Sequence, residues 1–206
     1  MLQHVYEAAV RSEAFDQVVF AVDHEKTATL VEGFGAPYHM TSVTCESGTD
    51  RLVELSDRFD AKVFVNWQGD EPLVSSEMIR DLLQSVEDGA DIWTLKTALS
   101  PERAHHPHTV KVVTRTDGRA LYFSREAIPH GGPYFKHIGL YAFSKKGLYK
   151  ISQLAPSFLE KAEKLEQLRF LENGLDIIVH ETSCDSVGID HETDVAFAEQ
   201  WLTERG

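Results

Sequence analysis

Residues 63–72 read VFVNWQGDEP, and this stretch decides the fold. Its short run of β-branched and aromatic residues, closed by Gly69 and Pro72, is typical of an interior strand of a parallel sheet. Open α/β sheets bind ligands at the carboxyl ends of such strands, so we expect Asp70 at the mouth of a ligand-binding crevice, where it could hold a metal. The alternative is a simple turn in which Asp70 only accepts hydrogen bonds from backbone amides.

The residues on either side of this strand alternate between helical and extended patterns. Apolar residues recur at helical spacing over residues 2–10, and residues 25–34 form a second helical pattern after Asp23, a candidate N-cap. Further helices are expected over residues 47–58 and 75–86. Strands are expected over residues 18–22, 38–41, 63–65 and 92–98. This alternation predicts an α/β domain whose mixed sheet is mainly parallel and has crossover helices.

The pattern changes after Ser100. Residues 110–113 and 120–123 flank an Asp-Gly turn at Asp117, which predicts a β-hairpin and hence an antiparallel insertion. We expect a strand over residues 138–143, helices over 145–154 and 159–173, a strand over 177–179 and a last helix from Glu192. Residues 1–206 are therefore expected to form a single domain.

Composition restricts the partners. The 206 residues are 42% hydrophobic and 26% charged, as in ordinary soluble proteins. A net charge of −13 disfavours nucleic acid and anionic membranes, so we expect a small-molecule substrate, with any phosphate held by a local basic cluster or a divalent cation. The first residues lack a signal-peptide profile and no apolar stretch is long enough to cross a bilayer, so we expect the cytoplasm.

Seven short segments spread along the chain are similar to one known family. They are residues 47–51 (SGTDR), 66–72 (NWQGDEP), 110–113 (VKVV), 122–125 (YFSR), 137–141 (HIGLY), 165–169 (LEQLR) and 188–190 (GID). Together they resemble the bacterial 3-deoxy-manno-octulosonate cytidylyltransferases, which activate a sugar for lipopolysaccharide. The resemblance implies a Rossmann-like nucleotidyltransferase fold, a homodimer, and a reaction that joins CTP to the sugar and releases pyrophosphate.

The resemblance also implies a catalytic set of Asp70, Asp190 and Lys111, with both aspartates as ligands of Mg2+. Negative charge builds on the phosphate oxygens and on the leaving pyrophosphate during this reaction, and Mg2+ needs only one or two protein carboxylates beside the substrate phosphates. The alternative for Asp190 is an N-cap of the helix that contains Glu192.

The sugar is a carboxylate with many hydroxyls, so its pocket needs a guanidinium and several acceptors. By resemblance the binding residues are Ser47, Thr49, Arg51, Gln68, Arg125, His137, Glu166 and Gln167. Each also has an ordinary structural interpretation, such as a helix cap, a surface charge or a core histidine. Similarly, the apolar segment around Leu140 and Phe143 could supply a dimer interface or simply pack in the core.

The chain departs from the family at its start. Family members begin with a strand and a basic, glycine-containing loop that binds CTP, whereas residues 1–5 align with the helix that follows that loop. We therefore expect that the natural protein begins upstream, that an unpaired slot about one strand wide is left in the sheet, and that this chain binds CTP poorly.

Three alternative functions stay open. The first is a synthetase for the 8-amino analogue of the same sugar. The second is a glycosyltransferase of similar sheet architecture, which would release a nucleoside diphosphate. The third is a binding protein that retains only the sugar site. A fourth idea, a metal site in residues 105–108 (HHPH), is disfavoured because the spacing lacks the helical histidine pair of a zinc motif, so a solvated loop is expected there.

Overall fold

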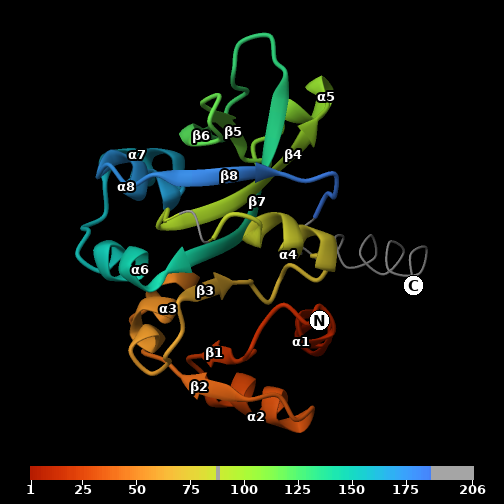
Figure 1. Ribbon diagram of the computed structural model, residues 1–206, viewed down its shortest axis with the longest axis vertical. Coiled ribbons are helices and arrows are strands. Elements are labelled where there is room, and N and C mark those ends of the chain that lie inside the picture. Colours follow the sequence, from red (N-terminus) through yellow and green to blue (C-terminus); the bar gives the residue numbers. More distant parts are fainter. Residues whose placement is uncertain (87–88, 187–206) are drawn as a thin grey trace.

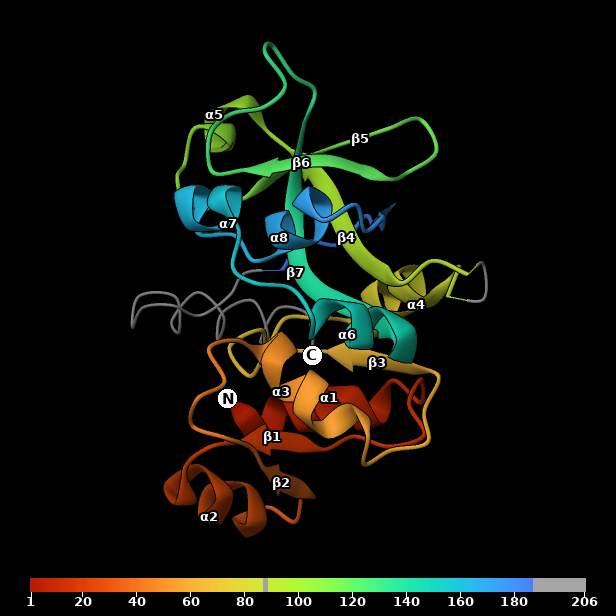
Figure 2. The ribbon, with the colours of Figure 1, turned by 90° about the vertical axis from the view of Figure 1, so that its left-hand side faces the viewer.

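The computed structural model describes residues 1–86 and 89–186. The predicted metal ligand Asp190 and the helix expected from Glu192 lie outside the described residues. Figure 1 shows two ends of the described part: β1, β2 and α2 lie at one end, and β5, β6 and α5 lie at the other. Figure 2, turned by 90°, shows the same separation.

The strands form two sheets. β1 (Phe20–Val22) and β2 (Tyr38–Met40) make a parallel pair. The other sheet contains β3 (Val63–Asn66), β4 (Ile92–Leu99), β5 (Lys111–Thr114), β6 (Ala120–Ser124), β7 (Tyr134–Ser144) and β8 (Ile177–Glu181). Within the described residues, no ladder joins the two sheets.

The long strand β7 organises the larger sheet. It is antiparallel to β3, β4 and β5, while β4 and β8 are parallel to each other. β3, β4 and β8 therefore run in one direction, and the antiparallel insertion predicted after Ser100 sends β7 between β3 and β4 (Figure 1). The predicted α/β class is confirmed. Periodicity did not indicate that the inserted strand β7 would lie between β3 and β4.

Five helices lie where the sequence predicts them: α1 (Leu2–Arg11), α2 (Glu25–Gly33), α3 (Gly48–Ser56), α4 (Ser76–Leu83) and α6 (Lys145–Ile151). The short helix α5 (Pro101–Ala104) was not predicted. α2 corrects one detail, because His24 is its N-cap and the Asp23 carboxylate instead pairs with Arg51 at 2.7 Å. None of the helices in the described residues is both long and apolar enough to cross a membrane.

The single helix predicted over residues 159–173 is wrong. The structure has two short helices, α7 (Phe158–Glu163) and α8 (Gln167–Glu172), separated at Lys164, whose φ of 55° and ψ of 50° are left-handed. A left-handed residue ends a helix as a C-terminal glycine commonly does. Lysine is a good helix former, so the pattern gave no sign of this break. The break leaves the carbonyl oxygens of Glu163 and Lys164 to accept hydrogen bonds from Arg125.

Two apolar clusters form the core. One joins β3, β4, β7 and β8 to α6 and α8, and the other packs α4 against β4 and β7. Leu140 and Phe143 are 2% and 0% exposed, so they belong to these clusters and cannot supply a dimer interface. Their structural interpretation is therefore the correct one.

Gly147 marks a close approach between α6 and the start of β4. A Cβ at this position would lie 2.5 Å from the backbone carbonyl oxygen of Asp91, and a backbone atom cannot swing away. We expect Gly147→Ala to lower the free energy of unfolding by about 1–3 kcal/mol, despite the better helix propensity of alanine. Urea unfolding checks this, with Gly33→Ala in α2 as the matched control, because nothing lies within 4 Å of a Cβ there. Equal stability of the two variants would contradict this account of the packing.

Candidate active site

A cavity of about 930 Å3 opens beside the carboxyl end of β3. Its wall is built by the turn after β3, the amino end of α3, the middle of β7 and the break between α7 and α8. Eight of the predicted site residues line it: Ser47, Thr49, Gln68, Asp70, Arg125, His137, Glu166 and Gln167. These residues come from segments far apart in the sequence, so the fold brings them together.

Asp70 lies on the turn that follows β3. The turn is fixed by a hydrogen bond from the Glu71 amide to the Gln68 carbonyl at 3.1 Å and by the Trp67 indole, which donates to the Glu71 carbonyl at 2.9 Å. Within the described residues, the Asp70 carboxylate makes no hydrogen bond or ion pair, so the simple-turn alternative, in which it accepts from backbone amides, is not what the structure has. Asp70 lines the cavity, and no side chain of the described residues occupies its carboxylate.

Glu166 is held by two hydroxyl groups from the amino end of α3. Ser47 Oγ donates to its Oε1 at 2.7 Å and Thr49 Oγ1 donates to its Oε2 at 2.6 Å. Ser47 also caps α3 in a capping box with Asp50. Burial raises the pKa of the Glu166 carboxyl, and this effect outweighs the two hydroxyl hydrogen bonds and the nearby Arg169, which lower it. Ser47 therefore caps a helix and also orients a cavity carboxylate.

His137 and Tyr141 face the cavity from β7. His137 is 8% exposed, and its Nε2 lies 3.0 Å from Thr94 Oγ1, which also lies close to the Ile138 and Leu140 carbonyls. Burial, helped by the charge of Lys136, lowers the pKa of His137 to about 3, so the imidazole is neutral at ordinary pH.

The buried Tyr141 hydroxyl has no hydrogen-bond partner among the described residues, although it borders the cavity. Burial and the charge of Glu166 raise its pKa well above the ordinary value and outweigh the nearby Thr94 hydroxyl, which lowers it but lies outside hydrogen-bonding geometry, so Tyr141 stays a protonated donor. A buried donor without a partner is costly, and a ligand hydroxyl or carboxylate in the cavity would satisfy it.

Arg125 is positioned by α7. Its Nε donates to the Glu163 carbonyl at 2.9 Å and its Nη2 to the Lys164 carbonyl at 3.3 Å, while Glu163 Oε2 accepts from the Arg125 amide at 2.9 Å. The guanidinium therefore borders the cavity in a fixed orientation, with its charge uncompensated by a side-chain ion pair in the described part of the chain.

Two predicted basic residues do not face the cavity. Lys111 is fully buried, and its ammonium donates to the backbone carbonyls of Thr109, at 2.7 Å, and of Arg125. Arg51 is held by Asp23 at 2.7 Å and by Thr41 Oγ1 at 2.8 Å. Neither residue lines the cavity, and each cation holds loops together because buried carbonyls or a carboxylate already occupy its donors; the roles predicted for Lys111 and Arg51 stay predictions.

The sequence reasoning missed a second basic group in the cavity wall. Lys136 Nζ lies 2.8 Å from Asp185 Oδ1, and Arg103 Nη1 lies 3.0 Å from Asp185 Oδ2. Partial burial raises the pKa of Asp185, but hydrogen bonds and charge from Lys136 and Arg103 outweigh it and lower the pKa. The sequence offered one sign of this group: Lys136 directly precedes His137, the first residue of a segment predicted to line the site.

The histidine-rich loop also reaches the cavity. His106 and His108 are exposed residues that line its rim, with ring centroids 5.5 Å apart. No cluster of three His, Cys, Asp or Glu side chains that could hold a metal ion occurs in residues 1–86 and 89–186.

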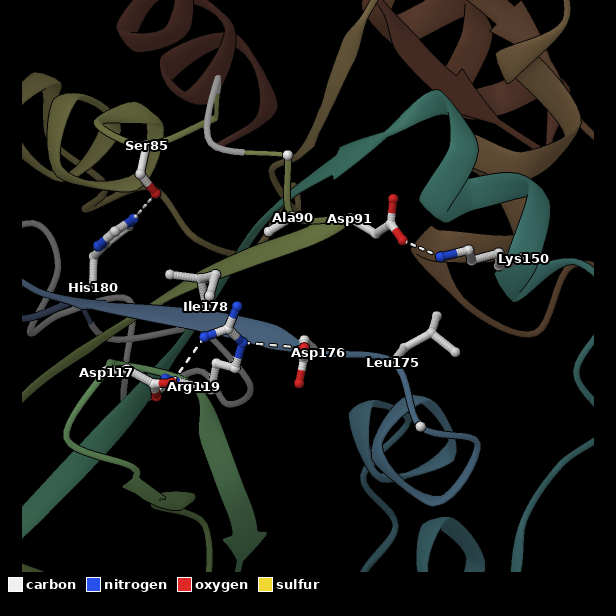
Figure 3. Close-up of a pocket in the computed structure, with 12 residues that line it drawn as sticks. Ser85, Ala90, Asp91, Asp117, Arg119, Lys150, Leu175, Asp176, Ile178 and His180 are labelled. Atoms are coloured by element: carbon white, nitrogen blue, oxygen red, sulfur yellow. Dashed lines mark hydrogen bonds and ion pairs between the residues drawn. The ribbon is translucent and has the colours of Figure 1, made fainter.

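A smaller cavity of about 440 Å3 lies elsewhere, against β8 (Figure 3). Its charged groups are already paired: Arg119 with Asp117 and Asp176, and Lys150 with Asp91. Ser85 Oγ lies 2.8 Å from His180 Nε2 at its far end. Because these side chains form hydrogen bonds and ion pairs with one another, this cavity offers a ligand fewer unpaired polar groups than the larger one.

Comparisons with known proteins agree on one family. Residues 1–177 match the family described as cytidylyltransferase. The 3-deoxy-manno-octulosonate cytidylyltransferase of Acidobacterium capsulatum is 42% identical over 212 residues, covering 100% of this chain and 86% of the relative. The enzyme of that name from Lawsonia intracellularis is 44% identical over 215 residues, covering 100% and 85%.

Solved structures extend the comparison. A CMP:2-keto-3-deoxy-manno-octonic acid synthetase complexed with CTP matches with a TM-score of 0.94 and 37% identity, covering 100% of this chain and 88% of that one. A putative glucose-1-phosphate thymidylyltransferase from Bacillus anthracis, at 14% identity and a TM-score of 0.67, shares the fold; the match covers 97% of this chain and 81% of that one.

The neutral state of His137 makes stability depend on pH. The unfolded imidazole takes up a proton below its ordinary value near 6.5, whereas the folded one does so only near 3, so acid favours unfolding. We expect this one group to lower the unfolding free energy by about 1.4 kcal/mol per pH unit between about pH 6 and pH 4. Urea unfolding at several pH values checks this: His137→Gln should reduce the slope, and the exposed His130→Gln should not. An unchanged slope in His137→Gln would refute the neutral, buried assignment.

Proposed function

Because this chain belongs to the 3-deoxy-manno-octulosonate cytidylyltransferase family, we propose that it transfers a cytidylyl group from CTP to 3-deoxy-manno-octulosonate and releases pyrophosphate. The observation that carries the proposal is the convergence of eight predicted site residues on one cavity. Cavities with a few oriented polar groups are where small ligands bind.

The cavity chemistry suits a sugar acid. Glu166 supplies an anionic acceptor for hydroxyls, Tyr141 supplies a donor without a partner, and neutral His137 adds a further polar group. Arg125, whose guanidinium has no side-chain ion pair in the described residues, gives the wall a positive charge suited to the substrate carboxylate, whereas Lys136 and Arg103 are paired with Asp185. These groups bind and orient the sugar so that its anomeric hydroxyl is directed at the α-phosphorus of CTP, and positioning of this kind supplies much of the acceleration in phosphoryl transfer.

We further propose that the enzyme uses Mg2+ held by Asp70, with Asp190 as the second carboxylate. The free Asp70 carboxylate at the cavity edge fits a hard cation that prefers oxygen ligands and keeps several waters. When bound, the ion would neutralise charge on the nucleotide phosphates. Lys111 has no part in this proposal, because its ammonium is buried among carbonyls.

The homodimer is a proposal that rests on the family resemblance, and the cytoplasmic location is a proposal that rests on the residue pattern of the sequence. The 8-amino analogue of the sugar is the alternative substrate, because a cavity with both donors and acceptors offers partners to an amine as well as to a hydroxyl.

The test is pyrophosphate release by this chain from CTP, Mg2+ and the eight-carbon sugar acid, with the 8-amino analogue in parallel. The Acidobacterium capsulatum relative serves as the positive control. We expect release that requires both CTP and sugar, slower than in the control and with a higher KM for CTP, because the sequence predicts weak CTP binding. Release of a nucleoside diphosphate from a sugar nucleotide would support the glycosyltransferase alternative. Calorimetric sugar binding without any turnover would support the binding-protein alternative.

Asp70→Asn tests the carboxylate. Without the anionic ligand Mg2+ binds less tightly and neutralises less of the charge that develops on the phosphates in the transition state, so kcat/KM should fall by about 100-fold or more. Added Mg2+ should partly restore the rate, because a higher concentration refills the weakened site. Pyrophosphate release measured against Mg2+ concentration checks this. The control is Asp60→Asn, an exposed aspartate that precedes β3 at its other end and should leave the rate unchanged. A fully active Asp70→Asn would rule out this role.

Tyr141→Phe tests the unpartnered hydroxyl. Its removal should raise the unfolding free energy by about 1 kcal/mol, since a buried unsatisfied donor disappears, and should raise KM for the sugar about tenfold. Thermal unfolding and pyrophosphate-release kinetics measure the two effects. A stabilised variant with unchanged KM would show that the hydroxyl does not contact the sugar.

A further inference from the structure

The helix α7 is held by polar contacts. None of its six residues is buried, and Phe158 at its start is 78% exposed. The Leu159 amide donates to Glu172 Oε2 at 3.0 Å, Glu163 accepts from Ser124 Oγ at 2.8 Å, and Glu160 binds Arg169. Of its apolar side chains only Leu159 packs, half-buried, against the larger apolar cluster, so the polar contacts contribute much of what holds α7 in place.

The Glu160–Arg169 pair is the most enclosed of these contacts. Arg169 Nε donates to Glu160 Oε2 at 2.9 Å and Nη2 donates to Oε1, which makes a two-point fork. Their side chains are only 14% and 12% exposed. Such a fork fixes the guanidinium plane as well as its position. Glu160 Oε2 also accepts from the Ser157 amide at 2.9 Å, which completes the capping box of α7.

Arg169 stands next to the cavity carboxylate. Its Nη2 lies 3.9 Å from Glu166 Oε1, beyond hydrogen-bonding distance. The same Oε1 accepts the hydrogen bond from Ser47, and Oε2 accepts the one from Thr49. Without its two hydrogen bonds to Glu160, the Arg169 guanidinium would draw the Glu166 carboxylate away from the Ser47 and Thr49 hydroxyls. An unpaired buried cation is strongly attracted to the nearest carboxylate.

We propose that Glu160 is a positioning residue for the sugar site: by binding Arg169 it keeps the Glu166 carboxylate on Ser47 and Thr49 and open to the substrate. The inference rests on the proposed function for its substrate. It assigns a role to α7, whose left-handed end at Lys164 lets Glu160 and Glu166 face the same guanidinium from two different helices.

Glu160→Gln is the direct test, since glutamine keeps the size and can still accept from the Ser157 amide. The matched control is Glu172→Gln, which also removes one charge from a carboxylate that binds α7, without contact to Arg169 or Glu166 in the described structure. We expect Glu160→Gln to raise KM for the sugar acid about tenfold, the effect of one weakened charged hydrogen bond, with kcat and KM for CTP within about twofold. Glu172→Gln should change none of the three.

A merely structural role would give a different result. Lower thermal stability with an unchanged KM for the sugar, or an equal rise in both KM values, would overturn the proposal. Should Glu160→Gln fail to fold, Arg169→Lys replaces it, because lysine keeps the charge without the fork and should produce the same selective rise in KM.

A second readout does not depend on turnover. Carbon-13 NMR of labelled glutamate, with Glu166→Gln to assign the signal, follows the titration of the Glu166 carboxyl. Ser47, Thr49, Arg169 and Asp50 surround it, and burial keeps its pKa above the ordinary value in the wild type. The pKa should shift in Glu160→Gln, where the approach of Arg169 lowers it and the loss of the Ser47 and Thr49 hydrogen bonds raises it, and stay in place in Glu172→Gln. An equal pKa in all three proteins would overturn the inference, whereas lack of wild-type turnover would reject only the proposed function.

Discussion

The site depends on one constraint: the Glu166 carboxylate is bound by the hydroxyls of Ser47 and Thr49, more than one hundred residues earlier in the chain. These two bonds join the amino end of α3 to the start of α8 across the cavity. Because both carboxylate oxygens are used, the orientation of the side chain is fixed before any ligand binds. Preorganisation of this kind lowers the entropy that binding must otherwise overcome.

The inserted strand β7 gives the cavity its floor. By pairing with β3 on one edge and β4 on the other, it places His137 and Tyr141 beside the turn that carries Asp70. The buried Thr94 hydroxyl sits where the β4–β7 register shifts and lies near His137. The irregularity in the sheet therefore coincides with the polar groups of the site. β-Bulges often re-aim side chains in this way next to active sites.

Much of this was readable from the sequence, for physical reasons. The β3 strand and its acidic turn follow from a short β-branched run closed by Gly69 and Pro72, and Ser47 was recognisable as a helix start. The break at Lys164 was not, because a good helix former adopts a left-handed conformation only in a tertiary context. The positions of Lys111 and Arg51 were equally hidden: charge in the sequence does not show which carbonyl or carboxylate is nearest. The Tyr141 hydroxyl needed the structure, since only burial shows that it lacks a partner.

The most direct measurement is a crystal structure of this chain with the eight-carbon sugar acid bound. The account predicts electron density for the sugar in the larger cavity, with one of its oxygens about 2.7 Å from the Tyr141 hydroxyl and another within hydrogen-bonding distance of Glu166. Sugar bound elsewhere, or bound in this cavity with the Tyr141 hydroxyl still unpartnered and Glu166 untouched, would contradict it.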